Sequence, residues 1–246
     1  MPHPPRFIHL RVHTEHSLLE GAVPVKKLVD LTAKAGIPAV AVTDTNNMFA
    51  ALEFSTLAVG AGVQPILGCQ VAVGFDPVLP GERPRLPAPV VLLAQSEAGY
   101  LNLLKLNSCL YLARSGQLPQ VTWEELAAHA GGLICLAGGA GGPVGRHLEA
   151  GQEPKARAAM ERLAGAFPGR LYVELQRHPD EAGVLPQPER ATEPGMIALA
   201  YEMGLPLVAT NDVYFPKAAM YLAHDALICI AEGARSEEHT SELQSL

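Results

Sequence analysis

Short runs rich in Val, Ile and Leu recur along the chain and are separated by longer segments in which apolar residues have helical spacing. Continuous apolar runs of this length are typical of strands buried on both faces of a parallel sheet. Seven are predicted as strands: 7–11 (FIHLR), 39–43 (AVAVT), 64–73 (QPILGCQVAV), 90–94 (VVLLA), 133–137 (LICLA), 171–176 (LYVELQ) and 206–210 (PLVAT). The pattern therefore predicts an α/β fold of β/α units, with one large barrel as the expected architecture.

The segments between these runs carry helix-terminating and helix-starting signals. Gly36 follows a helical segment over 25–35, and Gly204 follows the segment that precedes the last strand. Thr122 with Glu125 three residues later predicts a capping box at the start of TWEELAAHA. Each signal falls where a β/α repeat requires a break, which supports the strand assignment.

The chain is predicted to hold one domain over residues 1–233. Segments 75–89 and 178–194 contain several prolines and are interpreted as surface loops, since neither separates two hydrophobic cores. The tail 234–246 (ARSEEHTSELQSL) is polar, has no apolar periodicity and is expected to be disordered. It also resembles translated sequencing-adapter DNA, so we expect a non-native tail on a truncated gene product.

Composition excludes several classes of protein. The formal net charge of −7 over 246 residues argues against a free-standing nucleic-acid clamp, which would carry a basic stripe. No apolar run approaches the roughly 18 residues of a membrane span, and MPHPPR lacks the apolar core of a signal peptide. The four cysteines are far apart and three lie in apolar runs, which favours buried free thiols in a reducing cytoplasm.

Mostly polar residues lie at the carboxyl ends of the predicted strands, where functional groups of β/α barrels lie. They are Arg11, His13, Thr43, Asp44, Gln70, Gln95, Gly138, Gly139, Arg177, His178, Asn211 and Asp212. Imidazole and carboxylate are the usual ligands of zinc or manganese, but no HxH or HExxH pair is present. These residues alone leave a metal site and a hydrogen-bonded structural cluster both open.

Five other features have structural interpretations beside functional ones. His9 alternates with apolar neighbours inside a predicted strand, and His16 lies in a polar loop where an exposed side chain is expected. Asp44 fits the N-cap of a following helix at least as well as it fits a ligand. The glycine-rich run 138–145 precedes a helix but is a weak phosphate signal, and His224 is predicted to lie at the edge of the core.

Several stretches in the same order resemble one family. They are FIHLRVHTEHSLLEGA, GIPAVAVTDTNNMFAALEF, GVQPILGCQVAV, VVLLAQSEAGYLNLLKLNS, VATNDVYF and AHDALICI. Together they resemble the PHP (polymerase and histidinol phosphatase) domain at the N-terminus of the bacterial DNA polymerase III alpha subunit. The resemblance covers residues 7 to about 233 and implies a distorted seven-stranded β/α barrel.

Metal-binding members of this family carry about nine ligands in a trinuclear site, so the resemblance assigns a role to each position here. The ligand positions that keep a ligand-type residue are His13, Glu20, His178 and Asp212. The positions where a ligand is replaced are Arg11, Thr45, Gln70, Gly139 and Tyr214. A guanidinium at position 11 opposes divalent metal binding and is expected to pair with Glu20 or Asp212, while His9 and His16 match no ligand position.

The resemblance therefore implies a cytoplasmic domain of a DNA-directed DNA polymerase, active in DNA replication, whose PHP site has lost its metals and its catalysis. Such a domain acts as a structural scaffold and docks a proofreading exonuclease subunit. Its other implied partners are the remaining polymerase domains, with the sliding clamp and DNA reached through the full-length protein, and no membrane. The polymerase site with its Mg²⁺ ions is expected to lie outside this chain. The alternative is a PHP phosphoesterase or 3′–5′ exonuclease with weakly bound Zn²⁺ or Mn²⁺.

Overall fold

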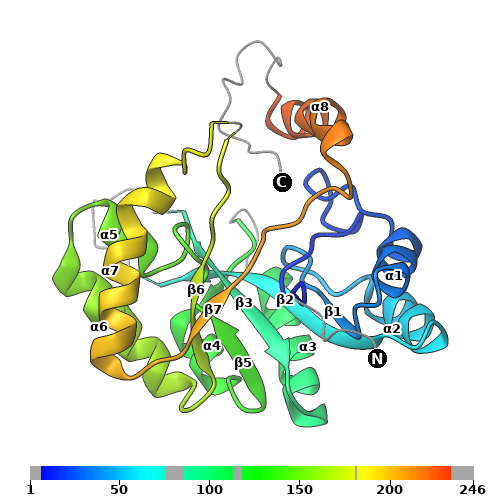
Figure 1. Cartoon of the computed structure of the whole chain (residues 1–246). Helices are drawn as coiled ribbons and strands as arrows, with labels where there is room; N and C mark the ends of the chain where they lie inside the picture. Colours follow the sequence, from blue (N-terminus) through cyan, green and yellow to red (C-terminus); the bar gives the residue numbers. More distant parts are fainter. Residues whose placement is uncertain (1–6, 76–85, 113–117, 181, 234–246) are drawn as a thin grey trace. The chain divides into compact units, whose positions relative to one another are not determined.

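The structure is a computed structural model that describes residues 7–75, 86–112, 118–180 and 182–233 (Figure 1). The chain divides into two compact units. The first contains the described parts of Met1–Gly68, Arg177–Pro186 and Thr210–Leu246, and the second contains those of Cys69–Gln176 and Gln187–Ala209. The predicted tail 234–246 and most of the proline-rich segment 75–89 lie outside the described residues, and the single-domain assignment stays a prediction.

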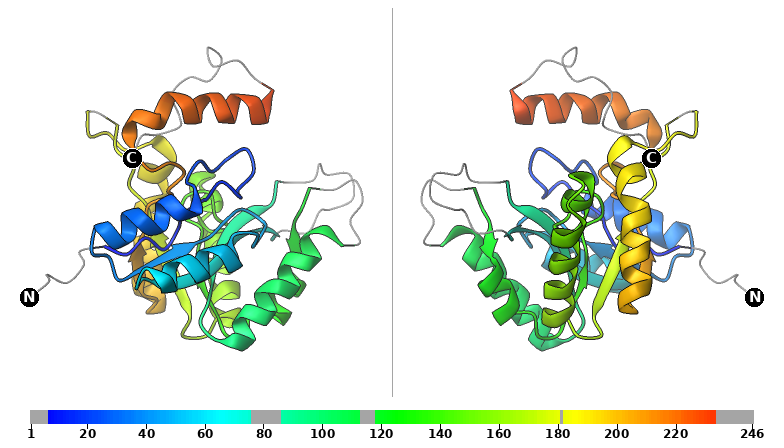
Figure 2. Two further views of the ribbon diagram at one scale, coloured as in Figure 1. Left: turned by 90° about the vertical axis from the view of Figure 1, so that its right-hand side faces the viewer. Right: turned by 90° about the vertical axis from the view of Figure 1, so that its left-hand side faces the viewer.

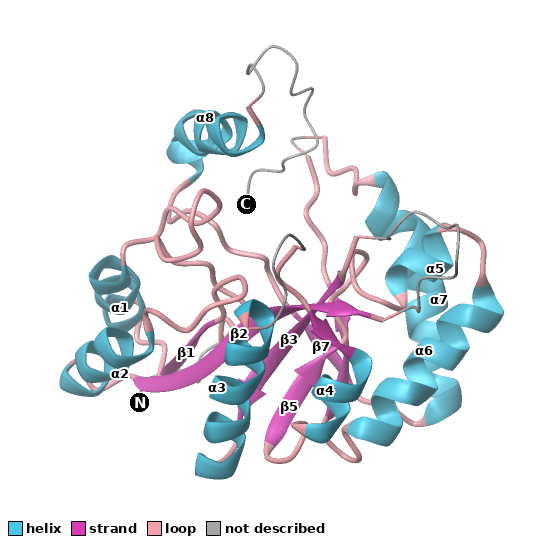
Figure 3. Ribbon diagram, turned by 180° about the vertical axis from the view of Figure 1, so that it is seen from behind, coloured by secondary structure: helices cyan, strands magenta, loops and turns pink. Residues whose placement is uncertain are grey.

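The first unit is built from α1 (Val25–Lys34), β1 (Ala39–Val42), α2 (Ala51–Gly60) and the first part of β2 (Gln64–Gly74), followed late in the chain by η1 (Ala218–Met220) and α8 (Tyr221–Glu232). Helices α1 and α2 lie side by side next to β1 (Figure 3). Their core is aliphatic and aromatic, with Val12, Val40 and Phe54 fully buried in it. Burial of these side chains is the main favourable contribution to the stability of the unit.

The second unit holds the remaining strands: β3 (Ala88–Ala94), β4 (Val121–Thr122), β5 (Leu133–Leu136), β6 (Leu171–Leu175) and β7 (Leu207–Ala209). Its helices are α3 (Glu97–Tyr111), α4 (Trp123–Ala128), α5 (Gly145–Glu149), α6 (Glu153–Ala166) and α7 (Gln187–Met203). Fully buried leucines at 92, 103 and 133 tie its strands to α3, and α5, α6 and α7 pack against one another. The predicted capping box forms at α4, where Thr122 and Glu125 exchange two hydrogen bonds.

The strands form a seven-stranded sheet in the order β1-β2-β3-β5-β6-β7, with β4 paired to β2. Four of the strand pairings are parallel: β1 with β2, β2 with β4, β5 with β6, and β6 with β7. The pairing of β3 with β5 is antiparallel, which corrects the expectation of a wholly parallel sheet. The α/β fold class predicted for a PHP-type barrel, with helices between its strands, is confirmed.

One predicted strand is wrong. Residues 7–11 form no strand, although this segment lies beside β1, with Ala41 donating to the carbonyl of His9. The next residue, Val12, makes one isolated bridge, with Val213. Two such contacts are too sparse for a ladder, and the two-residue strand β4, which was not predicted, brings the sheet to seven.

Two further expectations can be compared with the structure. All four cysteines are free thiols, and Cys69, Cys135 and Cys229 are buried, as predicted. Burial raises the pKa of the Cys135 thiol far above its ordinary value, which favours its protonated form. Within the described residues no helix is long and apolar enough to cross a membrane.

Candidate functional site

Asp212 is the centre of a buried polar cluster in the first unit. Its Oδ1 lies 2.9 Å from Nε of Arg11 and 3.0 Å from Nε2 of His13. Both contacts depart from hydrogen-bond alignment, so they act as charge contacts between atoms sealed from solvent. Tyr214 donates its hydroxyl to the other carboxylate oxygen of Asp212 over 3.2 Å. Arg11, His13 and Tyr214, all singled out from the sequence, therefore contact Asp212, which was singled out with them.

Backbone pairing sets this convergence. His13 donates its amide to the carbonyl of Val213 (2.8 Å), and Val213 donates to that of Arg11 (3.4 Å). In extended chain, alternate residues point the same way, so Arg11 and His13 face Asp212 and Tyr214 while Val12 enters the core. The rings of His13 and Tyr214 stack, with centroids 4.4 Å apart and planes 9° from parallel.

The charges around Asp212 change the acidity of the cluster. Burial alone raises the pKa of the Asp212 carboxyl, but the Arg11 guanidinium, His13 and the Tyr214 hydroxyl outweigh it and hold that pKa well below its ordinary value. Burial and the neighbouring Asp212 carboxylate raise the pKa of Tyr214 well above its ordinary value. Asp212 is thus an anion with its charge already matched inside the protein.

Glu20 and Thr45 complete the other side of His13. Thr45 donates its hydroxyl to Oε2 of Glu20 over 2.5 Å, and Oγ1 of the same hydroxyl lies 3.2 Å from Nδ1 of His13. Ser17 Oγ lies at the same distance from Nδ1 and donates its own proton to Asp44. Each hydroxyl has one proton, so Nδ1 faces acceptors, as Nε2 does at Asp212. Both ring nitrogens of His13 therefore have partners inside the protein, whereas a metal ligand directs one of its ring nitrogens at the metal.

Asp44 is not an N-cap, and it reaches the cluster around Asp212 only through Ser17, whose Oγ lies 3.2 Å from Nδ1 of His13. Its carboxylate accepts from the amide and hydroxyl of Thr14, at 2.6 and 2.8 Å, and from the hydroxyl of Ser17 at 2.7 Å. No side chain caps α2, whose N-cap is Ala50, so the N-cap interpretation is wrong. Asp44 instead fixes the loop that carries Glu20. Sequence reasoning missed Thr14 and Ser17, because their partner Asp44 lies 30 and 27 positions away from them along the chain.

His224 contacts the turn that carries Glu20, whereas the sequence predicted only that it lies at the edge of the core. Its Nε2 lies 2.7 Å from the carbonyl oxygen of Glu20, and its ring packs against Tyr214 and Phe215. Gly21 follows Glu20 because a Cβ there would lie 1.9 Å from the carbonyl oxygen of Thr14. The turn that aims Glu20 at Thr45 is therefore held from α8 on one side and by a close backbone approach on the other.

The other predicted site residues divide between the units. His178 belongs to the first unit, where the amide of Asp212 donates to its Nε2 over 3.4 Å. Gln70 and Gly139 belong to the second unit. His16 is half-buried, with Nε2 4.0 Å from a carboxylate oxygen of Glu53, and His9 is half-buried rather than in a strand.

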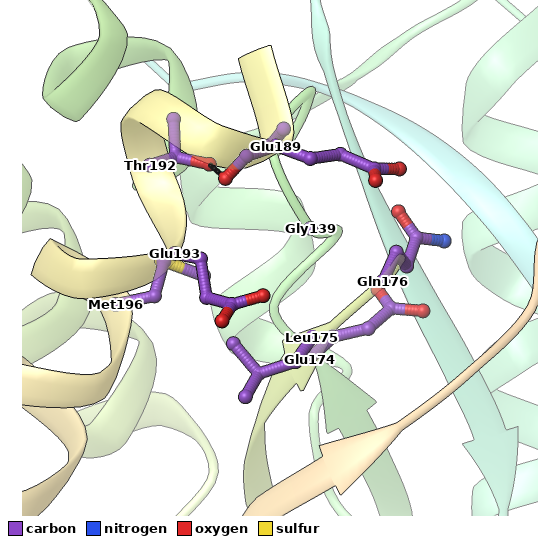
Figure 4. Close-up of a pocket in the computed structure, with 9 residues that line it drawn as sticks. Gly139, Glu174, Leu175, Gln176, Glu189, Thr192, Glu193 and Met196 are labelled. Atoms are coloured by element: carbon purple, nitrogen blue, oxygen red, sulfur yellow. Dashed lines mark hydrogen bonds between the residues drawn. The ribbon is translucent and has the colours of Figure 1, made fainter. Parts of the chain in front are cut away.

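Gly139 lines a pocket of the second unit with about 220 Å³ of empty space, part of it open to solvent (Figure 4). The lining residues are Gly139, Ala140, Glu174, Leu175, Gln176, Glu189, Thr192, Glu193 and Met196. The carboxylates of Glu189 and Glu193 on α7 point toward the space in front of Gly139 (Figure 4). A lining with three glutamates and no Lys, Arg or His does not fit a phosphate ester.

The glycine run 138–145 is explained by backbone packing. A Cβ at Gly138 would lie 2.1 Å from the carbonyl oxygen of Pro89, and one at Gly142 would lie 2.1 Å from that of Ala137. The helix that follows, α5, has only five residues. The close approaches account for the glycines without a bound phosphate.

Chemically, the cluster around Asp212 is an internally paired set of charges. Arg11 and His13 both contact the Asp212 carboxylate. His13 also lies against the Thr45 hydroxyl, which donates to Glu20, so the two carboxylates are connected by way of Thr45 and His13. Across the described residues no group of three or more His, Cys, Asp or Glu side chains is arranged to hold a metal ion.

Comparisons with known proteins place the chain in a family. Residues 9–178 match the model of the PHP domain. The chain is 47% identical over 230 residues to the DNA polymerase III subunit alpha of Caulobacter vibrioides, covering 93% of this chain and 20% of that protein. For the same subunit of Rickettsia felis the identity is 36% over 234 residues, covering 95% and 18%. The chain thus spans about a fifth of the length of the curated relatives it matches.

Solved structures show a more distant likeness. An amidohydrolase from Chromobacterium violaceum with bound sulfate and no metal aligns with a TM-score of 0.49 and 12% identity, covering 89% of this chain and 96% of that one. A two-domain Bacteroides vulgatus protein containing a predicted PHP-like metal-dependent phosphoesterase aligns with a TM-score of 0.48 and 14% identity, covering 84% and 51%. On the family match and the close relatives, the chain belongs to the PHP domain family and is homologous to the N-terminal part of bacterial DNA polymerase III alpha subunits.

Proposed function

We propose that this chain is a non-catalytic PHP domain of a replicative DNA polymerase, in which an ion-pair network has replaced the metal site of the family. In this proposal the domain is a scaffold for the polymerase and the docking site of a proofreading exonuclease subunit. Polymerisation with Mg²⁺, contact with the sliding clamp and contact with DNA belong to the whole polymerase, working in the cytoplasm.

The observation that carries the proposal is the contact between Arg11 and Asp212. A guanidinium cannot be deprotonated in a protein, so it delivers a permanent positive charge 2.9 Å from the carboxylate that a metal would need. His13 has both ring nitrogens directed at acceptors, which removes a second ligand. The donor set therefore does not fit a divalent cluster, and no catalytic step is assigned to it.

The same network supports the scaffold role. It joins segments that are far apart in the chain: 11–20, Asp44 and Thr45, 212–214, and His224 on α8. A buried network whose members are paired fixes one arrangement of these segments, because any other leaves charges unpaired out of water. The residues left by the lost metal site would thus hold the first unit in a single conformation for a partner to recognise.

Two assays on one preparation test this proposal. Hydrolysis of p-nitrophenyl phosphate and of a DNA 3′ end is measured with Mn²⁺ or Zn²⁺ added, and binding of the exonuclease subunit from the same bacterium is measured by calorimetry. We expect no hydrolysis above the buffer rate and one exonuclease bound per chain. The matched variant Asp212→Asn should weaken exonuclease binding at least tenfold by loosening the network. Metal-dependent hydrolysis that Asp212→Asn abolishes would instead establish the alternative, a PHP phosphoesterase or 3′–5′ exonuclease.

A further inference from the structure

The turn over residues 17–21, which carries Glu20, contains a leucine in a conformation that leucine rarely adopts. Leu19 has φ +64°, in the left-handed region, where a residue with a Cβ is disfavoured by a factor of about 5–30. Among the described residues Asn46 also has a positive φ without being glycine, and asparagine tolerates it. Leu19 is 48% exposed, so burial of its side chain offsets little of the strain. The conformation must be held by other contacts of the turn.

The hydrogen bonds inside the turn do not favour a leucine at this position. The carbonyl of Ser17 accepts from the amides of Glu20 and Gly21, at 2.9 and 2.8 Å. Turns with a positive φ at the third residue, which is Leu19 here, normally carry Gly or Asn there. Such amides can bond to water instead, so the net gain from the two bonds is comparable with the strain. By itself the turn is therefore balanced between this conformation and one with negative φ at Leu19.

Two contacts from distant parts of the first unit hold the ends of the turn. At its start, the Ser17 hydroxyl donates to the Asp44 carboxylate over 2.7 Å. At its end, Nε2 of His224 lies 2.7 Å from the carbonyl oxygen of Glu20, and because a carbonyl only accepts, this nitrogen is the donor. Figure 2 shows α8, which carries His224, lying over the blue loop that contains the turn. The His224 side chain is itself buried, so its donor is fixed in position.

We propose that His224 is a latch that keeps the strained turn closed, so that the position of α8 decides whether Glu20 takes part in the ion-pair network. With the latch in place, the Glu20 carboxylate accepts from the Thr45 hydroxyl. Without it, Leu19 relaxes to negative φ, and the rotation of the backbone takes the Glu20 carboxylate away from Thr45. The start of the turn stays fixed by Asp44, so the movement is confined to residues 19–21. Such a latch operates within the first unit whether or not the domain is a scaffold.

Amide hydrogen exchange of the whole chain, resolved by residue, tests the latch. We expect His224→Ala to speed exchange at Glu20 and Gly21 at least tenfold and to leave exchange in α3, in the second unit, unchanged. Adding Leu19→Asn should restore most of the lost protection, because asparagine tolerates the left-handed region without the latch. Leu18→Asn is the matched control and should restore none, since this neighbouring leucine is 69% exposed and has no positive φ.

A double-mutant cycle reports on the Glu20 carboxylate. Thr45→Val should lower the urea midpoint of the parent protein, because Glu20 and His13 lose their contact with the Thr45 hydroxyl. The same change should have less than half this effect in the His224→Ala background, where Glu20 has already left Thr45. Equal effects in the two backgrounds would refute the coupling of the turn to the network.

Unchanged exchange at Glu20 and Gly21 in His224→Ala would overturn the proposal. So would faster exchange that Leu19→Asn does not reverse, because lost packing of the His224 ring, and not released strain, would then explain it. If His224→Ala also speeds exchange in α3, the variant has lost its fold and Leu19→Asn in the parent decides. It should slow exchange at Gly21 about fivefold or more and raise the melting temperature, whereas Leu18→Asn should do neither. An unchanged or lower melting temperature of Leu19→Asn would refute the strained turn.

Discussion

Nε of Arg11 lies 2.9 Å from Oδ1 of Asp212, with the two side chains 5% and 19% exposed. Removing one partner of a buried pair leaves the other charge without compensation, which typically costs 3–5 kcal/mol. We expect Asp212→Asn to lower the free energy of unfolding in urea by about 3 kcal/mol. Arg11→Met combined with Asp212→Asn should cost less than the two single changes added together. The matched control is Glu202→Gln, which breaks an exposed pair with Arg157 and should leave stability unchanged.

Acid should destabilise the protein through the same carboxylate. The pKa of Asp212 is lowered in the folded state, so its contribution to stability is present above the ordinary carboxyl pKa of 3.8 and is lost as the pH falls below it. Urea unfolding between pH 6 and pH 2.5 should show a steeper loss of stability for the parent than for Asp212→Asn. Parallel curves for the two proteins would mean that Asp212 has the same pKa folded and unfolded.

A side chain at position 139 should destabilise the protein. Gly139 has φ +58°, and a Cβ there would lie 2.4 Å from Oε1 of Gln176. Gly139→Ala should therefore lose about 2–4 kcal/mol of unfolding free energy, from left-handed strain plus overpacking. Gly151→Ala has a similar φ of +66° and open space, so it should lose only the strain part of about 1–2 kcal/mol. Gln176→Ala in the Gly139→Ala background should recover the difference between them.

Gly21 should not accept a side chain. A Cβ at this position would lie 1.9 Å from the carbonyl oxygen of Thr14, which is backbone and not the end of a flexible side chain. We expect Gly21→Ala to cost more than about 2 kcal/mol, measured by thermal unfolding. Gly60→Ala, at the end of α2 with nothing within 4 Å, should be neutral or stabilising by up to about 1 kcal/mol. A neutral Gly21→Ala would contradict the described turn.

The pattern of apolar runs predicted six of the seven strands because strands of a buried sheet must be apolar in themselves. The segment 7–11 reads as a strand for the same reason, but its single bonds to β1 and to Val213 can be seen only in the structure. The prolines of QPERATEP were interpreted as a loop, although α7 begins at Gln187 and contains Pro194. Helix α7 continues through that proline and packs against α5 and α6, which the local pattern does not show.

The family resemblance named most residues of the cluster around Asp212 as site positions, but it did not predict which side chains contact one another. It offered Glu20 or Asp212 as the partner of Arg11, and the structure has Nε of Arg11 2.9 Å from Oδ1 of Asp212. The roles of Thr14, Ser17 and His224 had no signal in the sequence, because each acts through a backbone group or through Asp44. Contacts between residues up to 204 positions apart depend on the fold, and no local pattern encodes them.

Metal content tests the central claim most directly. The purified chain and the variant Arg11→His/Thr45→His/Gln70→Glu are dialysed against Zn²⁺ and Mn²⁺, freed of unbound ions and measured by elemental analysis. The account predicts well under one ion per native chain, because the Arg11 guanidinium and the His13 ring occupy the positions beside Oδ1 of Asp212 that a cation would need. Two or three tightly held ions in the native chain would contradict it and would restore the phosphoesterase as the leading function.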